Sequence, residues 1–318
     1  MNLNITNILS LKRETFKKIM WNILVCTSSF NKKNINLNNI SKLVKINFNP
    51  YGRRLTESEL FKLVNENTIG IVSGTEIISK RVLLKAINLQ VISRCGTGTD
   101  NINKYAIKRK IKIFKTDKEP TLAVAEFVIT QILLALKHSY YHNFFLKKKK
   151  WKKIKGKMLS NCKVGLIGFG KIGRKIYKLL KPFKSELIIY DSNNPKYKSK
   201  NKLNFLLKNS DIITLNIPFN KKNKNFINNK KLKIIKNNAI LVNCSRGGLI
   251  DEKALFNKLK KNKEFVAILD CFEKEPYKGK LVKFKNIILS PHVASFTSET
   301  RDIMEKNAFL NCTQNLKI

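Results

Sequence analysis

Acidic residues are scarce in this chain. Its 318 residues include 64 Lys and Arg but only 21 Asp and Glu, which gives a formal net charge of +43. Such an excess is typical of proteins that bind nucleic acid or anionic membranes. Here the lysines are spread along the whole chain, and the densest cluster, 147-KKKKWKKIKGK-157, lies between two expected elements. We therefore interpret the charge as a compositional bias that attracts small anionic ligands, and predict neither a nucleic-acid nor a membrane partner.

Cysteine pairs and clustered histidines are also missing. The three histidines do not cluster, and no metal-ligand spacing occurs, so no metal site is expected. The six cysteines are far apart and form no CxxC pair, which predicts reduced thiols in a cytoplasmic protein rather than a disulfide framework. These cysteines are Cys26, Cys95, Cys162, Cys244, Cys271 and Cys312.

No apolar run is long enough to cross a membrane. The longest, residues 121–136, is shorter than a typical span and contains Glu126, so we expect a buried helix there. Residues 1–19 are basic and precede Met20, and we treat them as an N-terminal extension. Whether this extension is native, a targeting segment or a misassigned start stays open.

Short apolar strands alternate with helical patterns in two successive regions. In the first, strands are expected at 23–26, 69–73, 91–93 and 111–114, with helices at 58–65 and 81–87. The second begins at Lys163 and contains six expected strands, which lie within 164–168, 187–191, 212–218, 239–245, 265–270 and 287–292. Continuous apolar strands that alternate with helices indicate parallel sheets covered on both faces.

The chain is therefore predicted to be an α/β protein with two doubly wound parallel-sheet domains. We assign 20–119 and 296–318 to the first and 120–295 to the second. The segment 298–311 has helical spacing and follows the last strand of the second region, so we expect it to pack back onto the first domain.

Residues 163–191 join a strand, a glycine-rich turn, a helix and a second strand. Gly168, Gly170 and Gly173 form G-x-G-x-x-G directly after the first strand. In dinucleotide-binding folds these glycines allow a tight turn, a close approach of the backbone to the pyrophosphate, and close packing of helix on strand. Asp191 ends the second strand roughly 20 residues further on, where a carboxylate bonds the ribose hydroxyls. Because that carboxylate repels a 2′-phosphate, we predict NAD rather than NADP.

Three further side chains suit hydride transfer to a keto acid. Arg246, in 243-NCSRGGLIDEKAL-255, follows an apolar strand, and its planar guanidinium can bond a carboxylate twice. His292 follows the last strand and can exchange a proton near neutrality. A carboxylate beside His292 is needed to keep it charged and oriented, and Asp270 and Glu275 are both candidates. Ligands bind at the carboxyl ends of strands in such sheets.

The motifs and their order along the chain resemble those of the D-isomer-specific 2-hydroxyacid dehydrogenases. Among these enzymes, the phosphoglycerate dehydrogenases are the most similar. The resemblance covers about residues 22 to 311. It rests on NPYGRRLTESEL (49–60), SGTEII (73–78), ISRCGTGTDNI (92–102), AVAEFVI (123–129), GFGKIG (168–173), NCSRGGLIDEKAL (243–255), LDCFEKEP (269–276) and SPHVAS (290–295).

The resemblance implies a catalytic set and two groups of binding residues. The catalytic residues are Arg246, Glu275 and His292. The substrate-binding residues are Ser73, Gly74, Arg94, Gly96 and Arg246. The cofactor-binding residues are Thr97, Gly168, Gly170, Lys171, Ile172, Gly173, Asp191, Cys244, Ser245, Asp270 and Ser295. The resemblance also implies that the first domain is a discontinuous, flavodoxin-like substrate domain and the second a Rossmann NAD-binding domain. It further implies a homodimer formed through the NAD-binding domain.

The substrate is less well defined than the family. The resemblance favours 3-phosphoglycerate and a role in serine biosynthesis. Some relatives that use this substrate have a basic residue just before the matching serine, whereas this chain has Val72, so Arg94 or nearby lysines would have to contact the phosphate. The alternatives are a glyoxylate or hydroxypyruvate reductase and, in another class, a non-enzymatic corepressor that senses dinucleotide.

Overall fold

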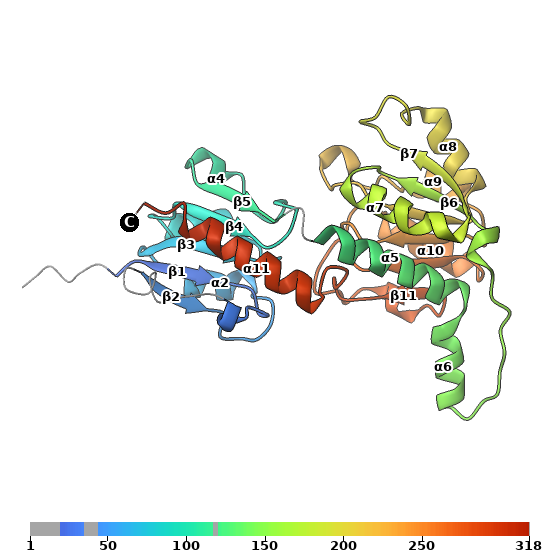
Figure 1. Cartoon of the computed structure of the whole chain (residues 1–318), viewed down its shortest axis with the longest axis horizontal. Coiled ribbons are helices and arrows are strands. Elements are labelled where there is room, and N and C mark those ends of the chain that lie inside the picture. Colours follow the sequence, from blue (N-terminus) through green and yellow to red (C-terminus); the bar gives the residue numbers. More distant parts are fainter. Residues whose placement is uncertain (1–19, 35–43, 117–119, 318) are drawn as a thin grey trace, which may run out of the picture. The chain divides into compact units, whose positions relative to one another are not determined.

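The chain divides into two compact units. The computed structural model describes residues 20–34, 44–116 and 120–317, so the extension 1–19 lies outside the described residues. Unit 1 comprises the described parts of Met1–Asp117 and Arg301–Ile318, and unit 2 comprises those of Lys118–Thr300. Both are built on a parallel β-sheet (Figure 1).

Unit 1 contains a five-stranded parallel sheet in the order β2-β1-β3-β4-β5. Its strands are β1 (Asn22–Val25), β2 (Lys45–Phe48), β3 (Thr68–Ser73), β4 (Val91–Arg94) and β5 (Lys112–Lys115). This is the flavodoxin-like order, and the direction of winding reverses between β1 and β3. The carboxyl ends of these two strands are therefore the expected ligand-binding edge of unit 1.

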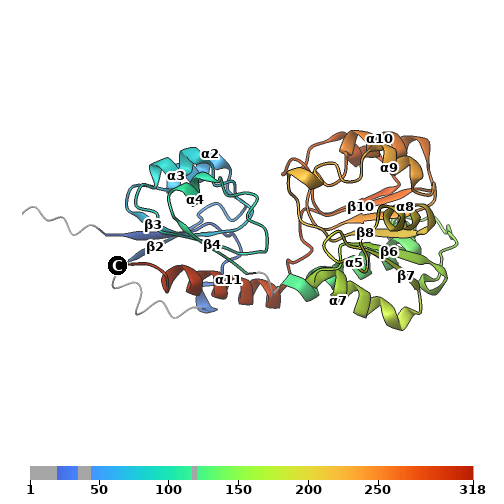
Figure 2. The same cartoon turned by 90° about the horizontal axis from the view of Figure 1, so that it is seen from above.

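Helices cover both faces of this sheet. One face carries α2 (Glu57–Leu63), α3 (Lys80–Lys85) and α4 (Tyr105–Lys108), and the other carries α11 (Ser298–Thr313) (Figure 2). The last helix completes the core, because its Met304, Ala308, Phe309 and Cys312 are buried against strands that include β1. Gly70 of β3 permits this approach, since a Cβ there would lie 2.7 Å from the Cys312 sulfur.

Unit 2 contains a six-stranded parallel sheet in the order β11-β10-β9-β8-β6-β7. Its strands are β6 (Lys163–Ile167), β7 (Glu186–Tyr190), β8 (Ile212–Leu215), β9 (Ile240–Asn243), β10 (Val266–Leu269) and β11 (Ile287–Leu289). Within the described residues no strand pairs with the outer edge of β7. In the Rossmann order 3-2-1-4-5-6, β6 and β7 are strands 1 and 2, so strand 3 is missing beside β7 in the described part of the chain. The direction of winding reverses between β6 and β8.

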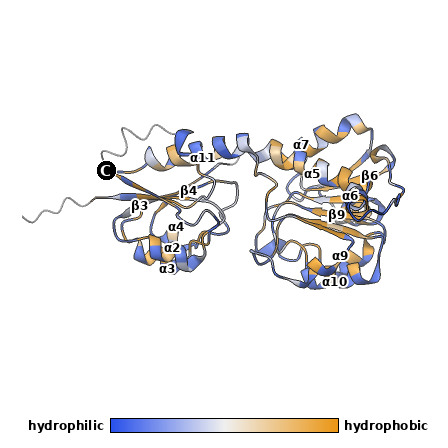
Figure 3. Cartoon of the chain, turned by 90° about the horizontal axis from the view of Figure 1, so that it is seen from below, coloured by the Kyte–Doolittle hydropathy of each residue, from blue (hydrophilic) through white to orange (hydrophobic). Residues whose placement is uncertain are grey.

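The helices of unit 2 form two layers. Helices α5 (Pro120–Leu136) and α7 (Lys171–Leu180) lie on one face, and α8 (Lys200–Asn209), α9 (Asn229–Ile234) and α10 (Glu252–Lys261) lie on the other (Figure 2). Helix α6 (Ser139–Lys147) continues beyond α5 (Figure 1). The strands are mostly hydrophobic, whereas helices such as α10 alternate between hydrophobic and hydrophilic residues (Figure 3). Short 3-10 helices occupy Lys32–Asn34, Leu159–Asn161, Lys181–Phe183, Lys221–Asn223 and Lys280–Lys283.

Helix α5 is the buried helix predicted from the longest apolar run. Its Ala125, Val128 and Ile132 pack into the core that β6 and α7 also line. Among the described helices, none is by itself long and apolar enough to cross a membrane. Helices α5 and α6 reach that length and composition only when taken together, and the chain bends by 60° between them.

Candidate active site

The glycine-rich turn joins β6 to α7 at the point where the sheet of unit 2 reverses. Gly168 has a φ of 95°, and a Cβ there would lie 2.5 Å from the Asn216 carbonyl oxygen. A Cβ on Gly173 would lie 2.1 Å from the Gly168 carbonyl oxygen, so any side chain would push α7 off the turn. Around Gly170, which caps α7, a Cβ would meet nothing within 4 Å. The turn is thus closed toward the protein and open at its second glycine, which suits a pyrophosphate at the helix N-terminus.

Asp191, which follows β7, lies against this turn. One carboxylate oxygen accepts the Phe169 N–H at 2.6 Å and the other accepts the Asn193 N–H at 2.8 Å. The carboxylate therefore fixes the shape of the glycine-rich turn. The structure thus places Asp191 beside the glycine-rich turn, and its bond to a ribose stays a prediction.

Arg246 lies in a loop that is tied to the ends of two strands. Asn243, the last residue of β9, accepts the Ser245 N–H at 3.1 Å and donates to the Arg246 carbonyl at 2.8 Å. The Ser245 hydroxyl donates to the carbonyl of Leu215 at the end of β8 at 2.6 Å. The half-buried Arg246 guanidinium donates to the Ser245 carbonyl at 2.7 Å. These bonds hold the guanidinium at the carboxyl edge of the sheet.

Gly247 brings the Arg246 loop into contact with the segment that follows β10. A Cβ at this position would lie 1.9 Å from the main-chain carbonyl of Phe272, so no side chain fits. Because Glu275 is only three residues beyond Phe272, this close approach fixes the Arg246 loop and the Glu275 loop relative to each other.

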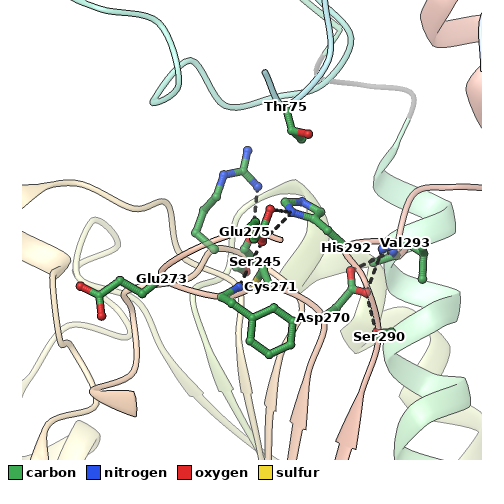
Figure 4. Close-up of polar contacts among 12 residues, drawn as sticks. Thr75, Ser245, Asp270, Cys271, Glu273, Glu275, Ser290, His292 and Val293 are labelled. Atoms are coloured by element: carbon green, nitrogen blue, oxygen red, sulfur yellow. Dashed lines mark hydrogen bonds and ion pairs between the residues drawn. The ribbon is translucent and has the colours of Figure 1, made fainter. Parts of the chain in front are cut away.

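Glu275 and His292 form a pair at the same edge of the sheet (Figure 4). The Nδ1 of His292 lies 3.0 and 3.1 Å from the two carboxylate oxygens of Glu275. With Glu275 ionised, Nδ1 carries a proton and donates it to the carboxylate. This arrangement leaves Nε2 as the ring nitrogen that can exchange a proton with a ligand. The side chains are 28% and 19% exposed, so the pair is partly shielded from water.

Asp270 supports the segment that carries His292. Its carboxylate accepts the Ser290 hydroxyl at 2.5 Å and the N–H groups of Val293 and Ala294 at 2.9 Å (Figure 4). His292 has a φ of 57°, a left-handed conformation that is uncommon for a non-glycine residue and that persists only where its surroundings hold it. Of the two carboxylates considered as partners of His292, Glu275 forms the pair, whereas Asp270 holds the Ser290 hydroxyl and the backbone that follows His292.

The other residues assigned to the cofactor lie around the same edge. Lys171 and Ile172 begin α7, with Lys171 exposed and Ile172 half-buried. Cys244 follows β9, and burial raises the pKa of its thiol, so this thiol stays protonated. Ser295 is half-buried in the turn after His292. All six cysteines of the chain are free thiols in the structure.

The residues of unit 1 assigned to substrate follow β3 and β4. Ser73 ends β3, and its buried hydroxyl has no hydrogen-bond partner within the described structure. Arg94 ends β4, is 5% exposed, and donates to the Cys95 carbonyl and to Asn101. Gly96 has a φ of 138°, and a Cβ there would lie 2.8 Å from the Arg94 guanidinium. Gly74 is buried, and Thr97, which was assigned to the cofactor instead, is half-buried. All five residues lie at or just beyond the carboxyl ends of β3 and β4.

Sequence patterns did not reveal two residues that shape this edge. Glu76, which is 2% exposed, accepts the Gly74 N–H at 2.5 Å. The Asn101 amide donates to the carbonyls of Glu76 at 2.6 Å and Gly74 at 3.3 Å. In the sequence both look like ordinary loop residues, and only their position after strand ends hinted at this role. Ser290 in unit 2 likewise looks like an ordinary loop residue in the sequence, yet it bonds Asp270.

The stability of the protein is expected to depend on pH through Glu76. Burial raises the pKa of its carboxyl group, although Arg54 and Arg94 oppose this effect. Because the pKa of Glu76 is higher in the folded than in the unfolded state, protonated Glu76 favours the folded state. This contribution to stability is complete below the unfolded pKa and is lost as pH rises through the folded pKa. Glu76→Gln should therefore gain stability relative to the wild type as pH rises above the unfolded pKa of about 4.3. Urea unfolding of both proteins at several pH values measures this, and a difference that does not change with pH would contradict it.

Comparison with known proteins identifies the family. Residues 129–294 match the family described as the NAD binding domain of D-isomer specific 2-hydroxyacid dehydrogenases. The D-3-phosphoglycerate dehydrogenase of Methanocaldococcus jannaschii is 35% identical over 78% of this chain and 49% of its own length, so the chain spans about half of that relative. The hydroxypyruvate reductase of Thermotoga maritima is 33% identical over 78% of this chain and 84% of its own length. The glyoxylate reductase of Thermococcus litoralis is 33% identical over 77% of this chain and 79% of its own length.

Solved structures share the fold of this chain. The TT0316 protein of Thermus thermophilus superposes with a TM-score of 0.79 at 26% identity, covering 92% of this chain and 95% of that one. The D-lactate dehydrogenase of Aquifex aeolicus, solved with NAD and lactic acid, shares the fold with a TM-score of 0.75 at 21% identity, over 91% and 94% of the two chains. The chain with the His292–Glu275 pair and the glycine-rich turn thus belongs to the D-isomer specific 2-hydroxyacid dehydrogenases, which are NAD-dependent oxidoreductases.

Proposed function

We propose that this protein interconverts a small 2-keto acid and the corresponding D-2-hydroxy acid, with 3-phosphohydroxypyruvate and 3-phosphoglycerate as the favoured pair. The His292–Glu275 pair carries this proposal, because it provides a positioned acid–base group in the unit that holds the glycine-rich turn. General acid–base catalysis of this kind needs a group that gains and loses a proton near neutrality, and imidazole is the side chain that does so.

Each residue of the set has a defined task in this proposal. NAD, held by the turn of Gly168, Gly170 and Gly173, supplies or accepts the hydride when bound. The guanidinium of Arg246 binds the substrate carboxylate through parallel N–H donors. His292 gives the proton on Nε2 to the carbonyl oxygen during reduction and takes it back during oxidation. Glu275 holds the imidazole ring in place by accepting the proton on Nδ1.

The names of relatives support two substrates. Phosphoglycerate dehydrogenase relatives favour 3-phosphoglycerate, and the reaction would then supply serine biosynthesis. Glyoxylate and hydroxypyruvate reductases of similar identity favour the second candidate, the reduction of an unphosphorylated keto acid.

A substrate panel tests this proposal. Oxidation of NADH is followed with 3-phosphohydroxypyruvate, hydroxypyruvate, glyoxylate and pyruvate. The highest kcat/KM is expected for 3-phosphohydroxypyruvate, whereas a preference for glyoxylate or hydroxypyruvate would establish the second candidate. A protein that turned over none of these acids, yet bound DNA with a steep salt dependence, would instead be a dinucleotide-sensing corepressor.

We also propose that the enzyme is a cytoplasmic homodimer formed through unit 2. Scattered free cysteines support the cytoplasmic location. Support for the dimer comes from exposed apolar side chains on and beyond α6, where Tyr140, Phe144, Leu146 and Trp151 are between 47% and 82% exposed. Exposed apolar surface of this kind marks an interface.

A further inference from the structure

The strand ends at the reversal point of unit 1 contain no cation of their own. β1 is followed by Cys26 and Thr27, and β3 is followed by Gly74 and Thr75. Val72, the residue before Ser73, is fully buried in the apolar core and contributes no charge. A cation that meets a second anionic group of a substrate must therefore come from another segment of the chain.

Arg54 reaches these strand ends from the loop between β2 and α2. Its Nη2 donates to the Thr75 carbonyl at 2.7 Å, directly after β3. The start of the loop is tied to β1, because the Asn49 amide donates to the Cys26 carbonyl at 2.7 Å and to the Arg53 carbonyl at 2.8 Å. Leu55, next to Arg54, is buried. The loop is therefore fixed at both strand ends that frame the ligand-binding edge.

The neighbouring Arg53 points elsewhere. Its guanidinium donates two bonds to the carboxylate of Glu59, at 3.0 and 2.7 Å, on the exposed side of α2. Glu59 also accepts the Thr56 N–H in the capping box of this helix, and the bond from Arg53 lowers the pKa of its carboxyl group to about 2. Two adjacent arginines thus have separate surroundings, and one serves as a matched control for the other.

Two guanidinium groups surround the turn that follows β3. Arg54 and Arg94 both lie near enough to the buried Glu76 to favour its charged form. Arg94 is almost completely buried and donates to Cys95 and Asn101, which fixes it inside the unit. Arg54 is half-buried, so of the two it has the more exposed side chain.

We propose that Arg54 binds the second anionic group of the substrate, a phosphate or a carboxylate, and thereby sets a preference for 2-keto acids that carry one. This inference rests on the proposed function. The bond to Thr75 orients the planar guanidinium before a ligand arrives, which reduces the entropy lost on binding. A guanidinium held in this way can meet two phosphate oxygens with parallel N–H donors.

The test compares two substrates that differ only in the phosphate, 3-phosphohydroxypyruvate and hydroxypyruvate. The measured quantity is the ratio of their kcat/KM values in the wild type, Arg54→Gln and Arg53→Gln. Arg54→Gln should lower this ratio roughly 10- to 100-fold, mainly through the KM of the phosphorylated substrate, because charge-assisted bonds are lost. Arg53→Gln removes the same charge one residue away and should leave the ratio unchanged. Arg54→Lys keeps the charge but not the planar fork, so its ratio should be intermediate.

The possible outcomes separate this inference from the proposed function. A wild type that reduces keto acids, with the same ratio in Arg54→Gln, overturns the assignment of Arg54 and leaves the proposed function standing. An equal fall of the ratio in Arg53→Gln also overturns it, because the effect would then be one of general charge. A wild type that reduces none of the keto acids overturns the proposed function and this assignment together.

Discussion

Replacing His292 with asparagine is expected to lower kcat for keto-acid reduction by roughly 10²- to 10⁴-fold, the usual contribution of a general acid–base group. The asparagine amide can still donate to Glu275, but it cannot give a proton to the carbonyl oxygen. The affinity for NADH should change little, since the glycine-rich turn and Asp191 do not depend on the imidazole. Steady-state NADH oxidation and a fluorescence titration with NADH measure the two quantities.

The Glu275→Gln variant and the double variant provide the control for His292. Because both residues act as one unit, the double variant should be little slower than His292→Asn alone. If the loss of kcat in the double variant equalled the product of the losses in the two single variants, the two side chains would act independently. A loss of NADH binding in His292→Asn would instead assign this residue to the cofactor site.

Replacing Arg246 with glutamine is expected to lower kcat/KM for keto acids by roughly 10²- to 10⁴-fold, because two charge-assisted hydrogen bonds to the carboxylate are lost. The effect should appear in both KM and kcat, since a poorly held carboxylate also misplaces the carbonyl. Arg246→Lys should recover part of the loss, because an ammonium restores the charge without the planar fork.

The matched control for Arg246 is Lys253→Gln, which removes one positive charge from an exposed position on α10. In a chain with a net charge of +43, this change should leave the kinetics unaltered, so that only the local contact is tested. Unchanged kinetics in Arg246→Gln would remove Arg246 from the substrate site.

Elements with strong apolar patterns were predictable from the sequence. The expected strands in both units correspond to observed strands, and the fold class is confirmed. The pattern missed β2, because K-I-N-F is a partly exposed edge strand with two polar residues among four. It also missed α4, which has only four residues, and α6, whose aromatic residues are not buried. Weak or exposed patterns carry little signal because nothing in the core selects them.

The functional groups at strand ends were also predictable, but their pairing was not. The residues alone left both Asp270 and Glu275 as candidate partners of His292, because both follow β10 closely, and only the family resemblance favoured Glu275. The choice depends on the left-handed conformation of His292 and on the contact of Gly247 with Phe272, and both are tertiary features. Likewise the sequence assigned no role to Arg54, although it lies in the 49–60 motif, since its contact with Thr75 depends on the path of the β2–α2 loop.

The return of α11 to unit 1 has a consequence for biosynthesis. Met304, Ala308, Phe309 and Cys312 cover the sheet of unit 1, yet they leave the ribosome only after all of Lys118–Thr300. At the usual rate of translation the nascent chain carries a bare apolar sheet face for roughly 10 to 40 s. During this time the face is a natural target for a chaperone, and a stalled ribosome would leave a chain prone to aggregation.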